Sequence, residues 1–128
     1  MKKGIFIILV MAGLLCSTLP ARAEKRVIHM KASIVNLRHG EFVGGWNPKH
    51  IEVQEGDEVT LIIKSIDAMH IFYLTGYKIR SKPISPGNPV TIKFVANTPG
   101  TFRYMCGMVC GPYHVHMYGT LVVHPKSK

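Results

Sequence analysis

The fold is indicated most directly by the stretch TPGTFRYMCGMVCGPYHVHMYGTLVVH, residues 98–124. Its Thr-Pro-Gly turn precedes a run that predicts a strand over residues 101–105, and a last strand is predicted over residues 120–124. The loop between them, residues 106–117, holds two glycines and a proline, which oppose a regular helix. The sequence therefore predicts two strands joined by a loop rich in cysteine, histidine and methionine.

Outward from this stretch, the chain continues as short strands separated by turns. Side chains alternate as in a half-buried strand over residues 25–36, whereas residues 38–48, with three glycines and a proline, are predicted to form a loop. Further strands are predicted over residues 50–53, 58–64, 70–74 and 90–95. Their regular spacing, with no helical period, predicts an all-β fold, an antiparallel β-sandwich of about seven or eight strands.

The first residues have the layout of an export signal. Two lysines precede an uncharged, largely apolar run over residues 4–19, and a small-x-small site follows at residues 21–23. The run is shorter than the roughly 20 residues that span a bilayer, so we expect a signal peptide over residues 1–23 and one periplasmic or otherwise exported domain over residues 24–128. A retained anchor is the alternative. Lipid attachment at Cys16 is disfavoured, because no small residue precedes it.

The charge of the chain argues against a nucleic-acid partner. The formal net charge is +9, and removal of the three basic residues of the predicted signal peptide leaves 13 basic against 7 acidic residues, a net charge of about +6. These basic residues are spread in pairs at most, without the clustering on one element that nucleic-acid binding requires.

No other segment of the predicted mature chain is apolar enough to span a membrane. We expect the mature protein to be a monomer.

Cysteine usage points to a metal. The predicted mature chain has only Cys106 and Cys110, separated by three residues. A disulfide across so short a loop is sterically allowed but stabilises little. His114 and Met117 follow in the same loop, and thiolate, thioether and imidazole together favour copper over calcium or magnesium. His70, between a polar turn and an apolar strand, is placed to supply a ligand from elsewhere.

These residues resemble a known family, the cupredoxins, and within it the CuA domains of cytochrome c oxidase subunit II and nitrous oxide reductase. The general part of the resemblance is PKHIEVQEGD at residues 48–57, DAMH at residues 67–70 and TPGTFRYMC at residues 98–106. The specific part is the spacing Cys-x3-Cys-x3-His-x2-Met, which residues 106–117 satisfy without a gap. The resemblance implies a cupredoxin-like Greek-key β-sandwich.

The resemblance also implies a dinuclear copper centre. Cys106 and Cys110 would bridge two copper ions, His70 and His114 would each bind one, and Met117 would be a weak axial ligand. The metal-contacting residues so predicted are His70, Cys106, Met108 through its backbone carbonyl, Cys110, His114 and Met117.

Such a site has every position filled by protein, so it predicts an electron carrier and no catalysis, since a catalytic metal keeps an open position. We expect a cytochrome c or a terminal oxidase or reductase as the redox partner. One alternative is a subunit of a larger redox complex. Another is a periplasmic copper chaperone or copper-site assembly protein, which would use the same soft ligands. A mononuclear blue-copper site is also compatible with the ligands, but it leaves one cysteine unexplained.

Residues near the predicted site have less specific roles. Asp67 is expected either to hydrogen-bond and orient the loop that carries His70 or to form only the turn there. Trp46 is expected to pack in the core, and His116 to lie at the solvent edge. The remaining histidines of the predicted domain are expected on the surface: His29, His39, His50 and His124. The methionines of the predicted domain outside the loop of residues 106–117 are expected to fill the core: Met30, Met69 and Met105.

Overall fold

The computed structural model describes residues 22–127, so nearly all of the predicted signal peptide lies outside the described residues. Its strands are β1 (Lys25–Arg38), β2 (Glu41–Asn47), β3 (His50–Gln54), β4 (Glu58–Ser65), β5 (Phe72–Leu74), β6 (Ile79–Arg80), β7 (Val90–Val95), β8 (Gly100–Cys106) and β9 (Tyr118–His124). One short 3₁₀ helix, η1 (His114–His116), lies between β8 and β9. The predicted all-β sandwich is confirmed. Residues 22–127 form nine strands, where about seven or eight were predicted.

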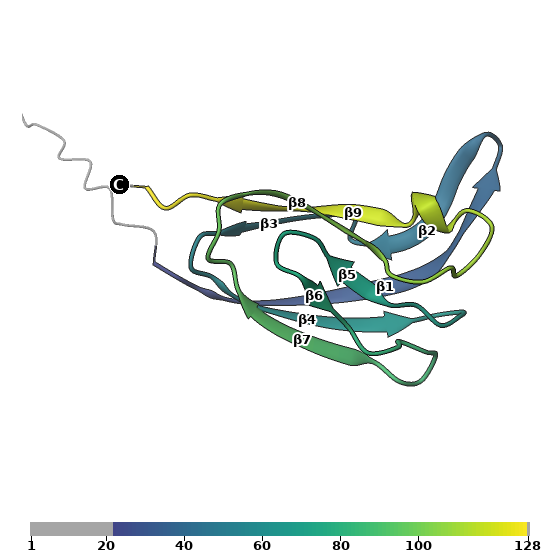
Figure 1. The fold of residues 1–128 in the computed structure, drawn as a ribbon, viewed down its shortest axis with the longest axis horizontal. Helices are drawn as coiled ribbons and strands as arrows, with labels where there is room; N and C mark the ends of the chain where they lie inside the picture. Colours follow the sequence, from purple (N-terminus) through teal and green to yellow (C-terminus); the bar gives the residue numbers. More distant parts are fainter. Residues whose placement is uncertain (1–21, 128) are drawn as a thin grey trace, which may run out of the picture.

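The strands form two sheets that pack face to face (Figure 1). One sheet has the order β2-β1-β4-β7 and the other β3-β9-β8-β5-β6. The predicted antiparallel pairing holds for most neighbouring strands, but β1 pairs with β4 and β3 pairs with β9 in parallel. In each of these pairs the chain visits the other sheet before it returns, and such a crossover brings strands together in parallel. Alternation along one strand carries no information about this direction.

The core lies between the sheets and is built from alternate strand positions. Trp46, Phe72 and Tyr104 are each at most 1 % exposed, and the Trp46 ring meets the Phe72 ring edge to face at 5.4 Å between centroids. Met30 is also buried, as predicted, whereas Met69 is 46 % exposed, which contradicts its predicted core position. Met69 directly precedes His70 in a polar turn, where the side chain faces outward while the histidine faces the core.

The predicted loop over residues 38–48 is in large part strand β2, which forms a hairpin with β1. Its two adjacent glycines have positive φ values, 93° at Gly44 and 86° at Gly45, beside a register shift in β1. A Cβ at Gly44 would lie 2.3 Å from the carbonyl oxygen of Ile34, so only glycine allows this close approach. The glycines that suggested a loop in the sequence are therefore the means by which the two strands approach.

The hairpin of β1 and β2 reaches the end of the sandwich that carries η1, far from the start of β1 and the end of β9 (Figure 1). Within residues 22–127, no helix is long and apolar enough to cross a membrane. The end of the molecule beside η1 is where the predicted metal ligands gather.

Candidate metal centre

The loop between β8 and β9 is closed by its own backbone. Cys106 is the last residue of β8, and its N–H donates to the carbonyl oxygen of Met117 at 3.1 Å. The indole N–H of Trp46 donates to the same carbonyl at 3.2 Å from within the core. Within the loop, the predicted absence of regular helix holds except for the single 3₁₀ turn of η1. The two ends of the loop are therefore fixed to each other and to the opposite sheet.

His70 comes to this loop from the connection between β4 and β5. Its backbone pairs with Ile84 in both directions, at 2.9 Å and 2.8 Å, and its side chain is fully buried. One ring nitrogen of His70 and the sulfurs of Cys106 and Cys110 all lie within 4.8 Å of one another. Both cysteines are free thiols, so the structure contains no disulfide between them.

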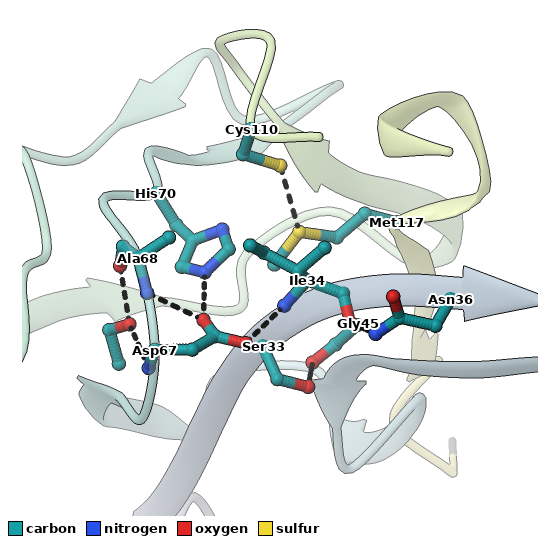
Figure 2. A network of polar contacts seen from close by, with 10 residues as sticks. Ser33, Ile34, Asn36, Gly45, Asp67, Ala68, His70, Cys110 and Met117 are labelled. Carbon is teal, nitrogen blue, oxygen red and sulfur yellow. Dashed lines mark hydrogen bonds and ion pairs between the residues drawn. The ribbon is translucent and has the colours of Figure 1, made fainter. Parts of the chain in front are cut away.

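Met117 completes the sulfur side of the cluster. Its thioether sulfur lies 3.5 Å from the Cys110 sulfur, and the side chain has no exposed surface. Figure 2 shows the Cys110 and Met117 sulfurs directed toward each other, with the His70 ring on the same side. Three of the predicted soft ligands and one imidazole are thus gathered at one point, although the chain separates His70 from the cysteines by more than thirty residues.

Two buried imidazole nitrogens lack a hydrogen-bond partner. They are Nδ1 of His70 and Nδ1 of His114, and no other buried side-chain nitrogen or oxygen within residues 22–127 is unpartnered. A buried polar group without a partner destabilises a protein by about 1–3 kcal/mol, so such groups are rare in folded proteins. The unpaired nitrogen of His70 lies beside the two thiols and fits a metal that would accept its lone pair. His114 is not part of that three-residue cluster, although its own unpaired nitrogen belongs to the same loop as the cysteines.

Asp67 holds His70 in the orientation that leaves Nδ1 free. Its carboxylate lies 3.0 Å from Nε2 of His70 and accepts from the backbone N–H groups of Ile34 and Ala68 at 2.7 Å and 2.6 Å (Figure 2). Burial raises the pKa of Asp67, but these hydrogen bonds outweigh it and leave the pKa below its usual value. A charged carboxylate at Nε2 favours the proton there, so Nδ1 carries the lone pair. The predicted orienting contact of Asp67 is present.

The two thiols differ in acidity. Burial raises the pKa of Cys106, but the adjacent His70 imidazole and the backbone N–H groups of Ile71 and Met108 outweigh it and lower the pKa to about 7. At Cys110, burial and then the neighbouring Cys106 raise the pKa to about 12. In the absence of a metal, Cys110 therefore keeps its proton at neutral pH, whereas Cys106 is partly ionised. A cation bound between the sulfurs would displace that proton, because thiolate is the form that binds metals.

Two residues of the loop take positions that the sequence left open. Met108 is partly buried against the core, and its backbone N–H lies beside the Cys106 sulfur. Its carbonyl as a copper ligand stays a prediction. The His116 ring is partly exposed and stacks on Phe42 from the β1–β2 hairpin, with centroids 3.7 Å apart and planes 17° from parallel.

Sequence reasoning missed Phe42, because it lies more than seventy residues from His116 in a glycine-rich stretch that predicted no strand. The four histidines predicted at the surface are exposed or partly exposed: His29, His39, His50 and His124.

Comparison with known proteins agrees with the fold and with this cluster. The family described as "Cupredoxin-like domain" matches residues 5–123. Cytochrome c oxidase subunit 2 from Thermus thermophilus is 37 % identical over 82 residues, covering 64 % of this chain and 60 % of that protein. Nitrous-oxide reductase from Stutzerimonas stutzeri is 38 % identical over 77 residues, covering 57 % of this chain and 12 % of that protein. The chain thus spans less than two thirds of either relative.

Solved structures give the same result for the fold. A multicopper oxidase, mgLAC, aligns with a TM-score of 0.62 and 26 % identity over 83 % of this chain and 40 % of its own. A chain of a heme-copper terminal oxidase dimer aligns with a TM-score of 0.57 over 80 % of this chain and 65 % of its own. At 19 % identity this second likeness shows the fold alone. The predicted resemblance to oxidase subunit II and nitrous oxide reductase is confirmed, and the chain belongs to the cupredoxin-like domain family.

Proposed function

We propose that this protein binds two copper ions between Cys106 and Cys110 and carries single electrons through that dinuclear centre. The observation that carries the proposal is the unpartnered, buried Nδ1 of His70, whose ring nitrogen lies within 4.8 Å of two free thiols, together with a second unpartnered Nδ1 on His114 in the same loop as the cysteines. Two imidazoles and two thiolates can supply one terminal ligand to each of two bridged ions. One thiolate alone would suffice for a mononuclear site, so the second cysteine favours the dinuclear form.

The arrangement suits electron transfer rather than catalysis. A copper pair bridged by two thiolates shares the added charge between both metals, so that ligand positions change little on reduction. His70 and Met117 are fully buried and fixed by backbone hydrogen bonds, so these residues resist movement when the charge changes. Oxidase and reductase relatives support a redox system as the setting. A cytochrome c or a terminal oxidase or reductase is the partner class that we propose, with the domain exported to the periplasm.

Electron paramagnetic resonance with copper analysis tests this proposal on the protein loaded under reducing conditions. The expected result is two copper ions per chain that share one unpaired electron and give a seven-line hyperfine pattern. A four-line signal from one copper would support the mononuclear alternative. Copper present only as EPR-silent Cu(I) that passes readily to a Cu(I) chelator would instead support copper delivery. Either of these two results would overturn the dinuclear electron carrier.

A further inference from the structure

Charged side chains are divided unequally along the chain. All seven acidic residues lie within residues 24–67, whereas residues 68–128 contain no acidic residue and seven lysines and arginines. That second part includes β5–β9 and the metal loop between β8 and β9. The one carboxylate on a strand of the five-stranded sheet is Glu52 on β3, where it is already bonded by His50 and His124. The strands next to the metal loop are therefore cationic.

One row of side chains crosses the outer face of this sheet beside the metal loop. The row runs over β6, β5, β8 and β9 and consists of Arg80, Tyr73, Met105 and Tyr118. Directly opposed residues share one face of a sheet, and the chain neighbours of Tyr73 and Met105 are buried in the core, so the row points outward. Arg103 lies on the same face, with its guanidinium carbon 4.7 Å from the centroid of the Tyr118 ring.

These five residues, here called the arginine–tyrosine face, have the composition of a protein interface. Both arginines are exposed and Tyr118 is 44 % exposed, while Met105 is partly buried on this face rather than in the core as predicted. Neither arginine forms an ion pair with any residue of 22–127. Tyrosine, methionine and arginine are enriched at interfaces, and unpaired cations there favour a partner that supplies carboxylates.

The arginine–tyrosine face adjoins the candidate metal centre. Met105 directly precedes Cys106, and Tyr118 directly follows Met117, so each is one peptide bond from a predicted ligand. At the end of the row, Nη2 of Arg80 donates to the carbonyl oxygen of Gly107 in the metal loop at 2.9 Å. A partner on this face would therefore contact the two strand ends that continue into the metal loop.

We propose that the arginine–tyrosine face docks the redox partner, and that this partner is a protein with carboxylates around its own electron-transfer site, as on an acidic c-type cytochrome. The inference rests on the proposed electron-carrier function, although docking itself can be measured without electron transfer. The face has two arginines, whereas recognition of an anionic membrane generally takes clusters of about 4–8 basic residues. A protein partner therefore fits the face better than a lipid surface does.

Stopped-flow kinetics tests the docking on the copper-loaded protein, with a c-type cytochrome of net negative charge as the electron donor. The second-order rate constant should fall as NaCl is added, because salt screens the attraction between exposed opposite charges. With a basic c-type cytochrome the rate constant should instead rise with salt. The same salt dependence for both cytochromes would overturn the inference.

Charge reversal locates the docking on the molecule. Arg80→Glu/Arg103→Glu should lower the rate constant for the acidic cytochrome at low salt by about tenfold or more, since electrostatic steering is worth that much in association rates. Lys31→Glu/Lys93→Glu is the matched control, because it changes the net charge equally at exposed positions of β1 and β7 on the other sheet. Arg103→Glu alone keeps the contact of Arg80 with Gly107, so it should slow the reaction while the copper spectrum stays unchanged. Equal losses in the two double variants would contradict docking at this face.

A binding measurement separates this inference from the proposed function. When both proteins are fully reduced no electron passes, and amide NMR signals that shift on addition of the acidic cytochrome should lie around the arginine–tyrosine face. Shifts gathered elsewhere would overturn the docking face and leave the electron carrier standing, whereas docking here without electron transfer would overturn only the carrier. Binding to phosphatidylglycerol vesicles through Arg80 and Arg103, with no effect of these residues on the cytochrome reaction, would assign the face to a membrane and overturn the protein partner.

Discussion

The imidazole of His70 depends on a single carboxylate for its orientation. Asp67 lies 3.0 Å from Nε2 and is itself held by two backbone N–H groups, so the ring presents Nδ1 to the cysteines. Removal of an outer partner of a metal-bound histidine generally costs 10- to 100-fold in metal affinity. The orientation of one ring thus limits how well the whole cluster can hold a metal.

Asp67→Asn should weaken copper binding by about 10- to 100-fold, because the amide is uncharged and has only one acceptor oxygen for three donors. The measurement is a competition titration against a Cu(I) chelator. Asn36→Ala is the matched control, since the Asn36 side chain is exposed and bonds only the carbonyl of Ile34. Equal affinity of Asp67→Asn and the unsubstituted protein would contradict the orienting role.

Cys106→Ser should abolish the two-copper form, because a serine hydroxyl does not bridge two copper ions as a thiolate does. Copper analysis and EPR spectra should show one copper or none per chain. Met117→Leu is the comparison variant: it removes a weak contact and should retain two coppers while the reduction potential shifts. Two coppers with an unchanged spectrum in Cys106→Ser would refute the bridging role.

Among the elements, the β1–β2 hairpin is the one that joins the body of the sandwich to the metal loop. The Phe42 ring stacks on the His116 ring, with centroids 3.7 Å apart, and its centroid lies 5.5 Å from that of the Tyr113 ring. Tyr113 and His116 lie on either side of His114 in the sequence. The carbonyl of Met117 is held by Trp46 of the same hairpin. The hairpin therefore holds the loop around η1 at two places. Phe42 packs on the partly exposed ring of His116, and Trp46 bonds Met117 from the core.

Phe42→Ala should increase the rate of copper loss to a chelator by about 2- to 13-fold, the equivalent of the roughly 0.5–1.5 kcal/mol that an aromatic pair contributes. Phe42→Tyr keeps the ring and should behave as the unsubstituted protein. Leu37→Ala is the control on the same hairpin, since Leu37 is 46 % exposed. Hydrogen exchange of η1 amides in the metal-free protein should accelerate only in Phe42→Ala, and a uniform rate in all three variants would contradict the restraint.

For the molecule as a whole, Asp57 joins the residues at the start of β1 to the turn between β3 and β4. Its fully buried carboxylate accepts from the N–H groups of Glu24 and Gln54, both at 2.9 Å, and from Nε of Arg26 at 3.2 Å. Burial raises the pKa of Asp57, but these donors outweigh it and lower the pKa below 3.8. The turn before β4 and the first residues of β1 thus depend on one charge.

Asp57→Asn should lower the free energy of unfolding at pH 7 by about 1–3 kcal/mol, because a buried charged acceptor of several donors is lost. A carboxylate whose folded pKa is lowered stabilises the protein above its unfolded pKa, near 3.8, and loses that contribution as pH falls through the folded value. Urea denaturation should therefore show the two proteins converging below pH 3.8. A difference that stays constant down to pH 2 would argue against the assignment. Glu58→Gln, at an exposed neighbour, is the control.

The sequence by itself determined most of the strands and the sandwich class, and it predicted the soft ligands. Alternation along β1 and β4 reports burial locally, and the spacing of Cys106, Cys110, His114 and Met117 lies within one loop. Such features depend on neighbours along the chain, so they can be recognised without coordinates. The choice of copper follows from the same residues, because ligand softness is a property of the side chains themselves.

Tertiary structure alone decided which distant segments meet. The parallel pairing of β1 with β4, the strand β2 in a glycine-rich stretch and the contact of Phe42 with His116 all depend on packing between residues far apart in sequence. The same holds for the unpaired Nδ1 atoms of His70 and His114, since a missing partner is visible only once every neighbour is placed. Local patterns carry no information about such pairings, because many long-range arrangements bury the same apolar faces equally well.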